Sequence, residues 1–115
     1  MPKTDRFVEF VREQFAPLGG ITARPMMGGW CLYCDGVIFA LIVAGELYLK
    51  TDPESVSRYE ARGLRPFRPF PDQPGVMRYY AAPPEIFEDP EAMREWAGGA
   101  VEAGRRSPRK KKRAG

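Results

Sequence analysis

The sequence predicts an α+β domain in which helices pack on one face of an antiparallel sheet. Two amphipathic stretches of helical spacing flank a central run of short apolar segments, and two-residue turns join these segments. Strands joined by such turns pair antiparallel, and helices at the two ends of the sequence can cover one face of their sheet. With 115 residues, the chain is long enough for one such domain and too short for two.

Three helices are predicted from apolar spacing and capping residues. Residues 5–16 carry a stripe that includes Val8, Val11 and Phe15. A short helix opens at Asp52-Pro53 and runs to about Arg62, because aspartate caps a helix and proline suits its first turn. The last helix starts at Asp89-Pro90-Glu91 in the same way. Its apolar face comprises Met93, Trp96, Ala97, Ala100 and Val101.

Five strands are predicted, at residues 21–26, 29–34, 37–43, 46–50 and 76–81. Asp35-Gly36 is a strong hairpin turn, because both positions tolerate positive φ, and Ala44-Gly45 joins the next pair of strands. The proline-rich segment 65–75 predicts a loop or an irregular edge strand around Phe67 and Phe70.

The two tight turns predict the register, and the register predicts which side chains share a face. Cys34 should oppose Val37, and Val43 should oppose Glu46. The face without charges, predicted to be the core face, then carries Cys31, Tyr33, Ile38, Ala40, Ile42, Leu47 and Leu49. The opposite face carries Trp30, Leu32, Cys34, Phe39, Leu41, Val43 and Tyr48.

An open sheet face of this composition would be a large exposed apolar patch, and such patches usually mark an interface. The candidate interaction face is therefore Trp30, Leu32, Phe39, Leu41 and Tyr48, and its partner is a second copy or another protein. In the alternative interpretation, the proline-rich segment or the last helix covers this face within the monomer.

The basic residues are concentrated at the C-terminus. Seven of the 18 lie within residues 105–115, which leaves eleven basic and fifteen acidic side chains, a net charge of −4, in residues 1–104. The sequence thus predicts a domain at 1–104 and a disordered basic tail at 105–115, and such tails are typical of nucleic-acid binding. The candidate nucleic-acid contacts are Arg105, Arg106, Arg109, Lys110, Lys111, Lys112 and Arg113.

Several function classes are disfavoured by composition. The chain has no histidine, which removes the commonest general base and zinc ligand, and two cysteines cannot complete a four-cysteine zinc site. Trp30-Cys31-Leu32-Tyr33-Cys34 is similar to the W-C-x-x-C of thiol oxidoreductases, but residues three apart in a strand point to opposite faces. No apolar run is long enough for a membrane helix, and the N-terminus has no signal-peptide pattern. We expect a cytoplasmic protein without a catalytic site, cofactor or metal.

Several separated motifs, in order, resemble the TfoX/Sxy N-terminal-domain family over about residues 5–104. They are Phe7-Val8-Glu9-Phe10-Val11, Ala16-Pro17-Leu18-Gly19, Arg24-Pro25-Met26-Met27-Gly28-Gly29, residues 32–41, residues 47–52, Tyr79-Tyr80, Pro83-Pro84-Glu85 and Glu88-Asp89-Pro90-Glu91. The resemblance implies a fold similar to type III secretion chaperones. It also implies kinship with competence regulators that promote transcription together with the cyclic-AMP receptor protein.

Those regulators carry a second, helical C-terminal domain, and we expect this protein to lack it, because only a basic tail follows Gly104. The family offers no catalytic residues to carry over. Arg24, Met26, Gly28 and Gly29 match its R-x-M-x-G-G loop, either as turn geometry or as a functional site. The leading hypothesis is a non-enzymatic regulatory or protein-interaction module. The alternatives are a non-specific nucleic-acid-binding protein that acts through its tail and, last, a thiol redox protein.

Overall fold

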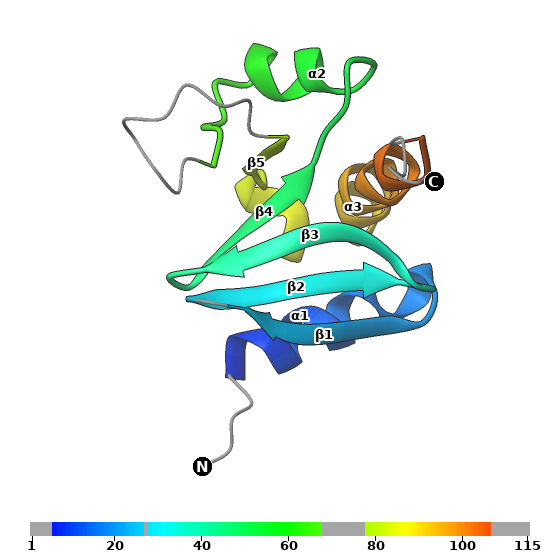
Figure 1. The fold of residues 1–115 in the computed structure, drawn as a ribbon. Coiled ribbons are helices and arrows are strands. Elements are labelled where there is room, and N and C mark those ends of the chain that lie inside the picture. The colour runs from blue at the N-terminus through cyan, green and yellow to red at the C-terminus, as the bar shows by residue number, and fades with distance from the viewer. Residues whose placement is uncertain (1–5, 27, 68–77, 107–115) are drawn as a thin grey trace, which may run out of the picture.

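In a computed structural model of the protein, residues 6–26, 28–67 and 78–106 are described (Figure 1). The helices are α1 (Arg6–Phe15), α2 (Val56–Ala61) and α3 (Pro90–Arg106), with two 3-10 helices, η1 (Ala16–Leu18) and η2 (Pro84–Phe87). The strands are β1 (Ile21–Met26), β2 (Gly29–Cys34), β3 (Val37–Val43), β4 (Glu46–Lys50) and β5 (Tyr79–Ala81). They form one antiparallel sheet in the order β1-β2-β3-β4-β5.

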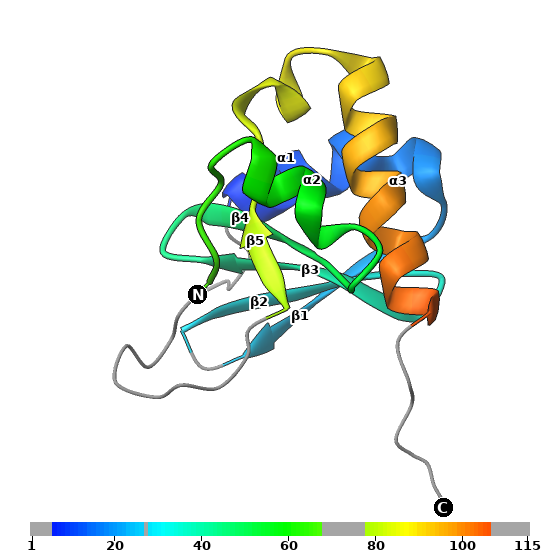
Figure 2. The ribbon, with the colours of Figure 1, turned by 90° about the horizontal axis from the view of Figure 1, so that it is seen from above.

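The three helices gather on one side of the sheet (Figure 2). The apolar stripe of α1 (Val8, Val11 and Phe15) and the predicted apolar face of α3 join the core cluster with residues of β2, β3 and β4. This arrangement confirms the predicted α+β class. The predicted similarity to type III secretion chaperones stays a prediction.

Both tight turns form as predicted and set the predicted residue pairs beside them. Asp35 and Gly36 adopt φ values of 51° and 85°, and Ala44 and Gly45 adopt 54° and 76°, the left-handed pairs that two-residue hairpins require. Cys34 accordingly pairs with Val37, and Val43 pairs with Glu46. Asp35 also fixes the preceding turn, because its Oδ1 accepts a hydrogen bond from the Gly20 amide at 2.9 Å.

The predicted assignment of side chains to the two faces is wrong for β2, because the β2–β3 ladder contains a β-bulge. Tyr33 pairs with Ile38, but Leu32 pairs with Ala40, so Phe39 is an extra residue between the two pairs. Such an insertion reverses the faces along the rest of the ladder. Leu32, Phe39 and Ala40 are therefore all fully buried in the core.

The segments between β4 and α3 follow their predictions only in part. Asp52 caps the turn 53–55, with its Oδ1 accepting from the amides of Glu54 and Ser55, and α2 begins only at Val56. The predicted strand 76–81 is described from Tyr79 onward. Pro66 forms a bridge with Tyr80, as expected of an irregular edge, while Phe70 lies outside the described residues. Pro84 opens η2, a 3-10 helix that is not among the predicted elements.

The predicted domain boundary after Gly104 falls inside α3, which continues to Arg106. The Arg106 Nε donates to Asp52 Oδ2 at 2.6 Å, so the last turn of α3 is joined to the turn that precedes α2. Arg105 lies 3.5 Å from Glu102. Both arginines therefore belong to the folded domain rather than to a disordered tail.

We expect Asp52→Asn to lower the free energy of unfolding at pH 7 by about 1 kcal/mol, because the amide still caps the turn but the ion pair with Arg106 is lost. The hydrogen bond from Arg106 lowers the pKa of Asp52 from 3.8 to about 2. The stabilisation is thus complete above pH 4 and disappears as the pH falls through 2. Urea denaturation of wild type and of Asp52→Asn should show that their difference in free energy of unfolding becomes smaller as the pH falls from 7 to 2. An equal difference at every pH would contradict the ion-pair explanation.

Candidate functional site

The five residues predicted to form an interaction face do not lie together. Leu32 and Phe39 are buried beneath the helices, and Trp30 packs against the same core cluster. Leu41 and Tyr48 pair with each other across β3 and β4 on the opposite face. Leu41 is only 6 % exposed, and the Tyr48 ring packs on Phe67 with centroids 4.9 Å apart. The predicted face therefore does not exist as an exposed patch.

The R-x-M-x-G-G loop has a clear geometric role at its glycines. Gly28 adopts a φ of +80°, and a Cβ on Gly29 would collide with the Ile42 carbonyl oxygen. Met26 and the exposed Arg24 lie at the edge strand β1, and the Met26 Sδ accepts a hydrogen bond from the Cys31 thiol at 3.4 Å. These contacts fit the turn-geometry interpretation of this loop.

The two cysteines lie on opposite faces of β2, as predicted, and both are free. Cys34 is buried with its thiol 3.7 Å from the Leu18 carbonyl oxygen, whereas Cys31 is half-buried beside Met26. Burial raises the pKa of Cys31, and burial together with the nearby Asp35 carboxylate raises that of Cys34. Raised pKa values disfavour thiolate chemistry at neutral pH.

We expect both thiols to react slowly with iodoacetamide at pH 7 and faster only as the pH rises above 9, the ordinary pKa of these groups. Cys34 should be the slower of the two, because the domain must open to expose it. Mass mapping of the alkylated sites against time measures both rates. Rapid labelling at pH 7, or a Cys31–Cys34 disulfide after mild oxidation, would support the redox hypothesis instead.

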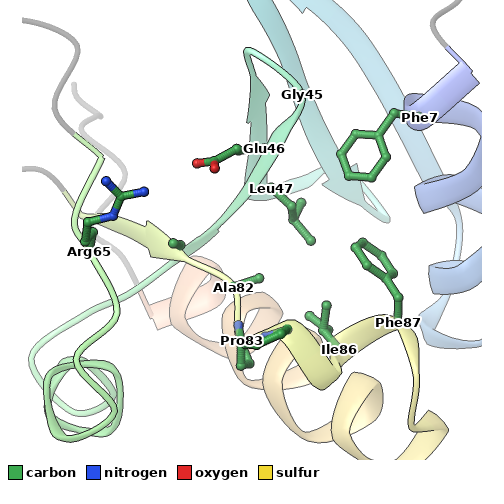
Figure 3. A pocket seen from close by; sticks show the side chains of 11 residues that line it. Phe7, Gly45, Glu46, Leu47, Arg65, Ala82, Pro83, Ile86 and Phe87 are labelled. Atoms are coloured by element: carbon green, nitrogen blue, oxygen red, sulfur yellow. The ribbon is translucent and has the colours of Figure 1, made fainter.

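A pocket with apolar walls lies between β4, the end of β5, η2 and the first turn of α1 (Figure 3). We call it the β4–η2 pocket. Its volume is about 240 Å³. Leu47, Ile86 and Pro83 form the apolar base, while the rings of Phe7 and Phe87 stand together at one end.

A carboxylate and a guanidinium mark the other end of this pocket. Glu46 and Arg65 are both exposed there and come from β4 and from the segment beside β5. The Tyr48 hydroxyl donates to Glu46 Oε1 at 2.9 Å, and burial together with this hydrogen bond raises the pKa of Tyr48. The pocket thus combines apolar walls with two polar groups of opposite charge at its mouth.

An aromatic cluster continues the apolar surface beyond the pocket. The Phe87 ring lies 5.9 Å from the Phe7 ring and 5.1 Å from the Phe10 ring, measured between centroids. Among the described residues, Phe10 is the one large hydrophobic side chain that is exposed, at 40 %. The exposure of Phe10 could be predicted from the sequence. Phe10 lies outside the apolar stripe of its helix, whose core-facing positions are occupied by other apolar residues.

The size of the β4–η2 pocket limits what it can hold. Small-molecule and cofactor sites usually enclose about 300–1,000 Å³. A volume of about 240 Å³ suits one bulky apolar side chain of a partner better than a dinucleotide or a flavin. Central anchor side chains of this kind, surrounded by a polar rim, carry most of the energy of protein–protein interfaces.

Two further observations concern the described residues. Within ranges 6–26, 28–67 and 78–106, no three of the Cys, Asp and Glu side chains gather as metal ligands would. No helix in the same ranges combines the length and apolar character needed to cross a bilayer. The predicted tail contacts Arg109, Lys110, Lys111, Lys112 and Arg113 lie outside these ranges.

The fold and pocket describe a small α+β domain built around one five-stranded meander. The profile of the TfoX N-terminal domain matches residues 13–104, which is most of the sequence. The protein belongs to the TfoX N-terminal domain family, as its motifs indicate. A comparison with curated proteins finds none that matches significantly.

Proposed function

We propose that this protein is a non-enzymatic, cytoplasmic interaction module with a regulatory role, and that the β4–η2 pocket is its docking site. The observation that carries the proposal is an apolar pocket of about 240 Å³ that adjoins the exposed Phe10. A partner protein would insert one bulky apolar side chain between Leu47 and Phe87. Because the protein resembles competence regulators, we further propose that its regulatory role is in the control of transcription.

The experiment places a photoreactive side chain at position 65, which is exposed at the mouth of the pocket, and identifies the cross-linked proteins by mass spectrometry. The control carries the same group at position 94, an exposed position on α3. We expect a partner that is captured from position 65 alone. Ala82→Phe, which fills the pocket from its lining, should abolish that capture.

Because Ala82 is half-buried, thermal unfolding of the Ala82→Phe variant must first show that the domain still folds. Arg65→Glu is a second variant that changes only an exposed side chain, with Arg94→Glu as its matched control. Equal capture from positions 65 and 94, or capture that survives both pocket variants, would contradict the proposal.

The alternative function, non-specific nucleic-acid binding, rests on the basic residues from Arg109 to Arg113. The remainder of the chain repels polyanions through its net negative charge, so any affinity must come from these residues. Deletion of residues 107–115 should abolish nucleic-acid binding and leave the capture of a partner at the β4–η2 pocket unchanged. The deletion begins after Arg106, since removing that residue would also break its ion pair with Asp52.

A homodimer, one of the two kinds of partner predicted for the interaction face, is part of the proposal, but its surface cannot be the predicted face. Leu32 and Phe39 would have to leave the core to reach a second copy.

A further inference from the structure

The outer face of α1 carries a narrow stripe of exposed side chains. At 3.6 residues per turn, Arg6, Phe10 and Glu13 lie within about 60° of one another, opposite the buried stripe of Val8, Val11 and Phe15. All three side chains are exposed, and together with Glu9 they line one shallow hollow.

The charges on this stripe run against the helix dipole. Anions stabilise the N-terminus of a helix and cations stabilise its C-terminus, yet Arg6 is the first residue of α1 and Glu13 lies in its last turn. Neither residue forms an ion pair within the described part of the chain, whereas Glu9 and Arg12 pair with each other at 3.3 Å. Arg6 and Glu13 are therefore placed unfavourably for the stability of α1 itself.

The charges of the stripe are complementary to those of a second copy of α1 that runs antiparallel to the first. Arg6 and Glu13 lie seven positions apart, about 10 Å along the helix axis, and Phe10 lies close to the midpoint between them. A second α1 placed antiparallel would bring its Glu13 to Arg6 and its Arg6 to Glu13. The two Phe10 rings would then meet near the twofold axis, as an isologous interface requires.

We propose that the protein forms a symmetric dimer through this stripe, with α1 packed antiparallel against α1 of a second copy. Each dimer contains two Arg6–Glu13 ion pairs around a central pair of Phe10 rings. One ten-residue helix face buries less than the roughly 800 Å² per partner of a standard interface, so the dimer is weak and depends on concentration. This inference does not depend on the β4–η2 pocket.

Sedimentation equilibrium of the full chain, from micromolar to millimolar concentration, tests the proposal. Wild-type protein should dimerise reversibly. Arg6→Glu or Glu13→Arg alone places like charges opposite each other and should weaken dimerisation at least about tenfold. The double variant, Arg6→Glu with Glu13→Arg, restores complementary charges and should dimerise within a few-fold of wild type. Glu91→Arg makes the same charge change at an exposed position on α3 and should have no effect.

Circular dichroism shows whether each variant keeps its fold, and the double variant also places its charges favourably for the dipole of α1. Wild-type protein that stays monomeric at every concentration would overturn the inference. So would single variants that dimerise as wild type does, or a folded double variant that fails to recover. Capture of a partner at position 65 should persist in Glu13→Arg, which separates failure of the dimer from failure of the pocket.

Discussion

Phe39→Asp is expected to unfold the protein, whereas Phe10→Asp should leave it folded. Phe39 is completely buried and packs on Phe15 with ring centroids 5.8 Å apart. Removing a buried aromatic ring costs about 3–5 kcal/mol, and a buried carboxylate without a partner adds to that loss. Because the whole stability of such a domain is about 5–15 kcal/mol, little of the folded state would remain.

Phe10→Asp is the matched control, since it makes the same chemical change on an exposed helix face. It loses ring contacts with Phe7 and Phe87, and we expect a cost of no more than about 1 kcal/mol. Far-ultraviolet circular dichroism and urea denaturation of the two variants measure the contrast. A folded Phe39→Asp protein with altered mass in solution would instead support the exposed face that the sequence predicts.

The sequence could predict the elements whose signals are local. The turns at Asp35-Gly36 and Ala44-Gly45, and the capping aspartate before α3, act within a few residues of themselves. Each forms as predicted because no distant contact is needed to favour it. The apolar face of α3 is also correct, since helical spacing alone determines which of its side chains lie together.

The sequence predicts the core face correctly for Ala40, Ile42, Leu47 and Leu49, which are buried in the core cluster, but it could not predict which face of β2 is buried. Every residue of β3 is apolar, so the alternation that normally distinguishes the core face from the open face is absent. The bulge at Phe39 then changes the register without a glycine or proline to mark it. Regular pairing counted from the Asp35-Gly36 turn ignores this bulge, and it therefore places Leu32 and Trp30 on the wrong face of the sheet.

The candidate site depends on contacts between distant segments. The β4–η2 pocket forms because Phe7 of α1 and Phe87 of η2, eighty residues apart, meet above β4. Pro83 and Pro84 are equally typical of a strand end, so the sequence does not reveal the 3-10 helix, beginning at Pro84, that positions Phe87. By contrast, the stripe of Arg6, Phe10 and Glu13 on α1 can be predicted from the sequence, because helical spacing places these residues opposite the buried stripe.

Two glycines of α3 should respond to alanine with opposite signs. A Cβ at Gly104 would lie 2.5 Å from the Ile38 carbonyl oxygen and 2.8 Å from Val37 Cγ1, because α3 crosses β3 there at close range. A Cβ at Gly98 would meet nothing within 4 Å. Both positions lie within the same helix, so the gain in helix propensity, about 1 kcal/mol, applies to each.

Gly98→Ala should therefore raise the free energy of unfolding by about 0.5–1 kcal/mol and the melting temperature by about 4 °C. Gly104→Ala gains the same propensity, but a backbone carbonyl cannot yield as a flexible side chain can, and overpacking costs about 1–3 kcal/mol. Its net effect is destabilising, with a melting temperature several degrees lower. Calorimetry of the two variants beside wild type makes the comparison. Stabilisation by both alanines would mean that α3 does not approach β3 as closely as the position of Gly104 indicates, and that the core beneath Val37 can expand without loss.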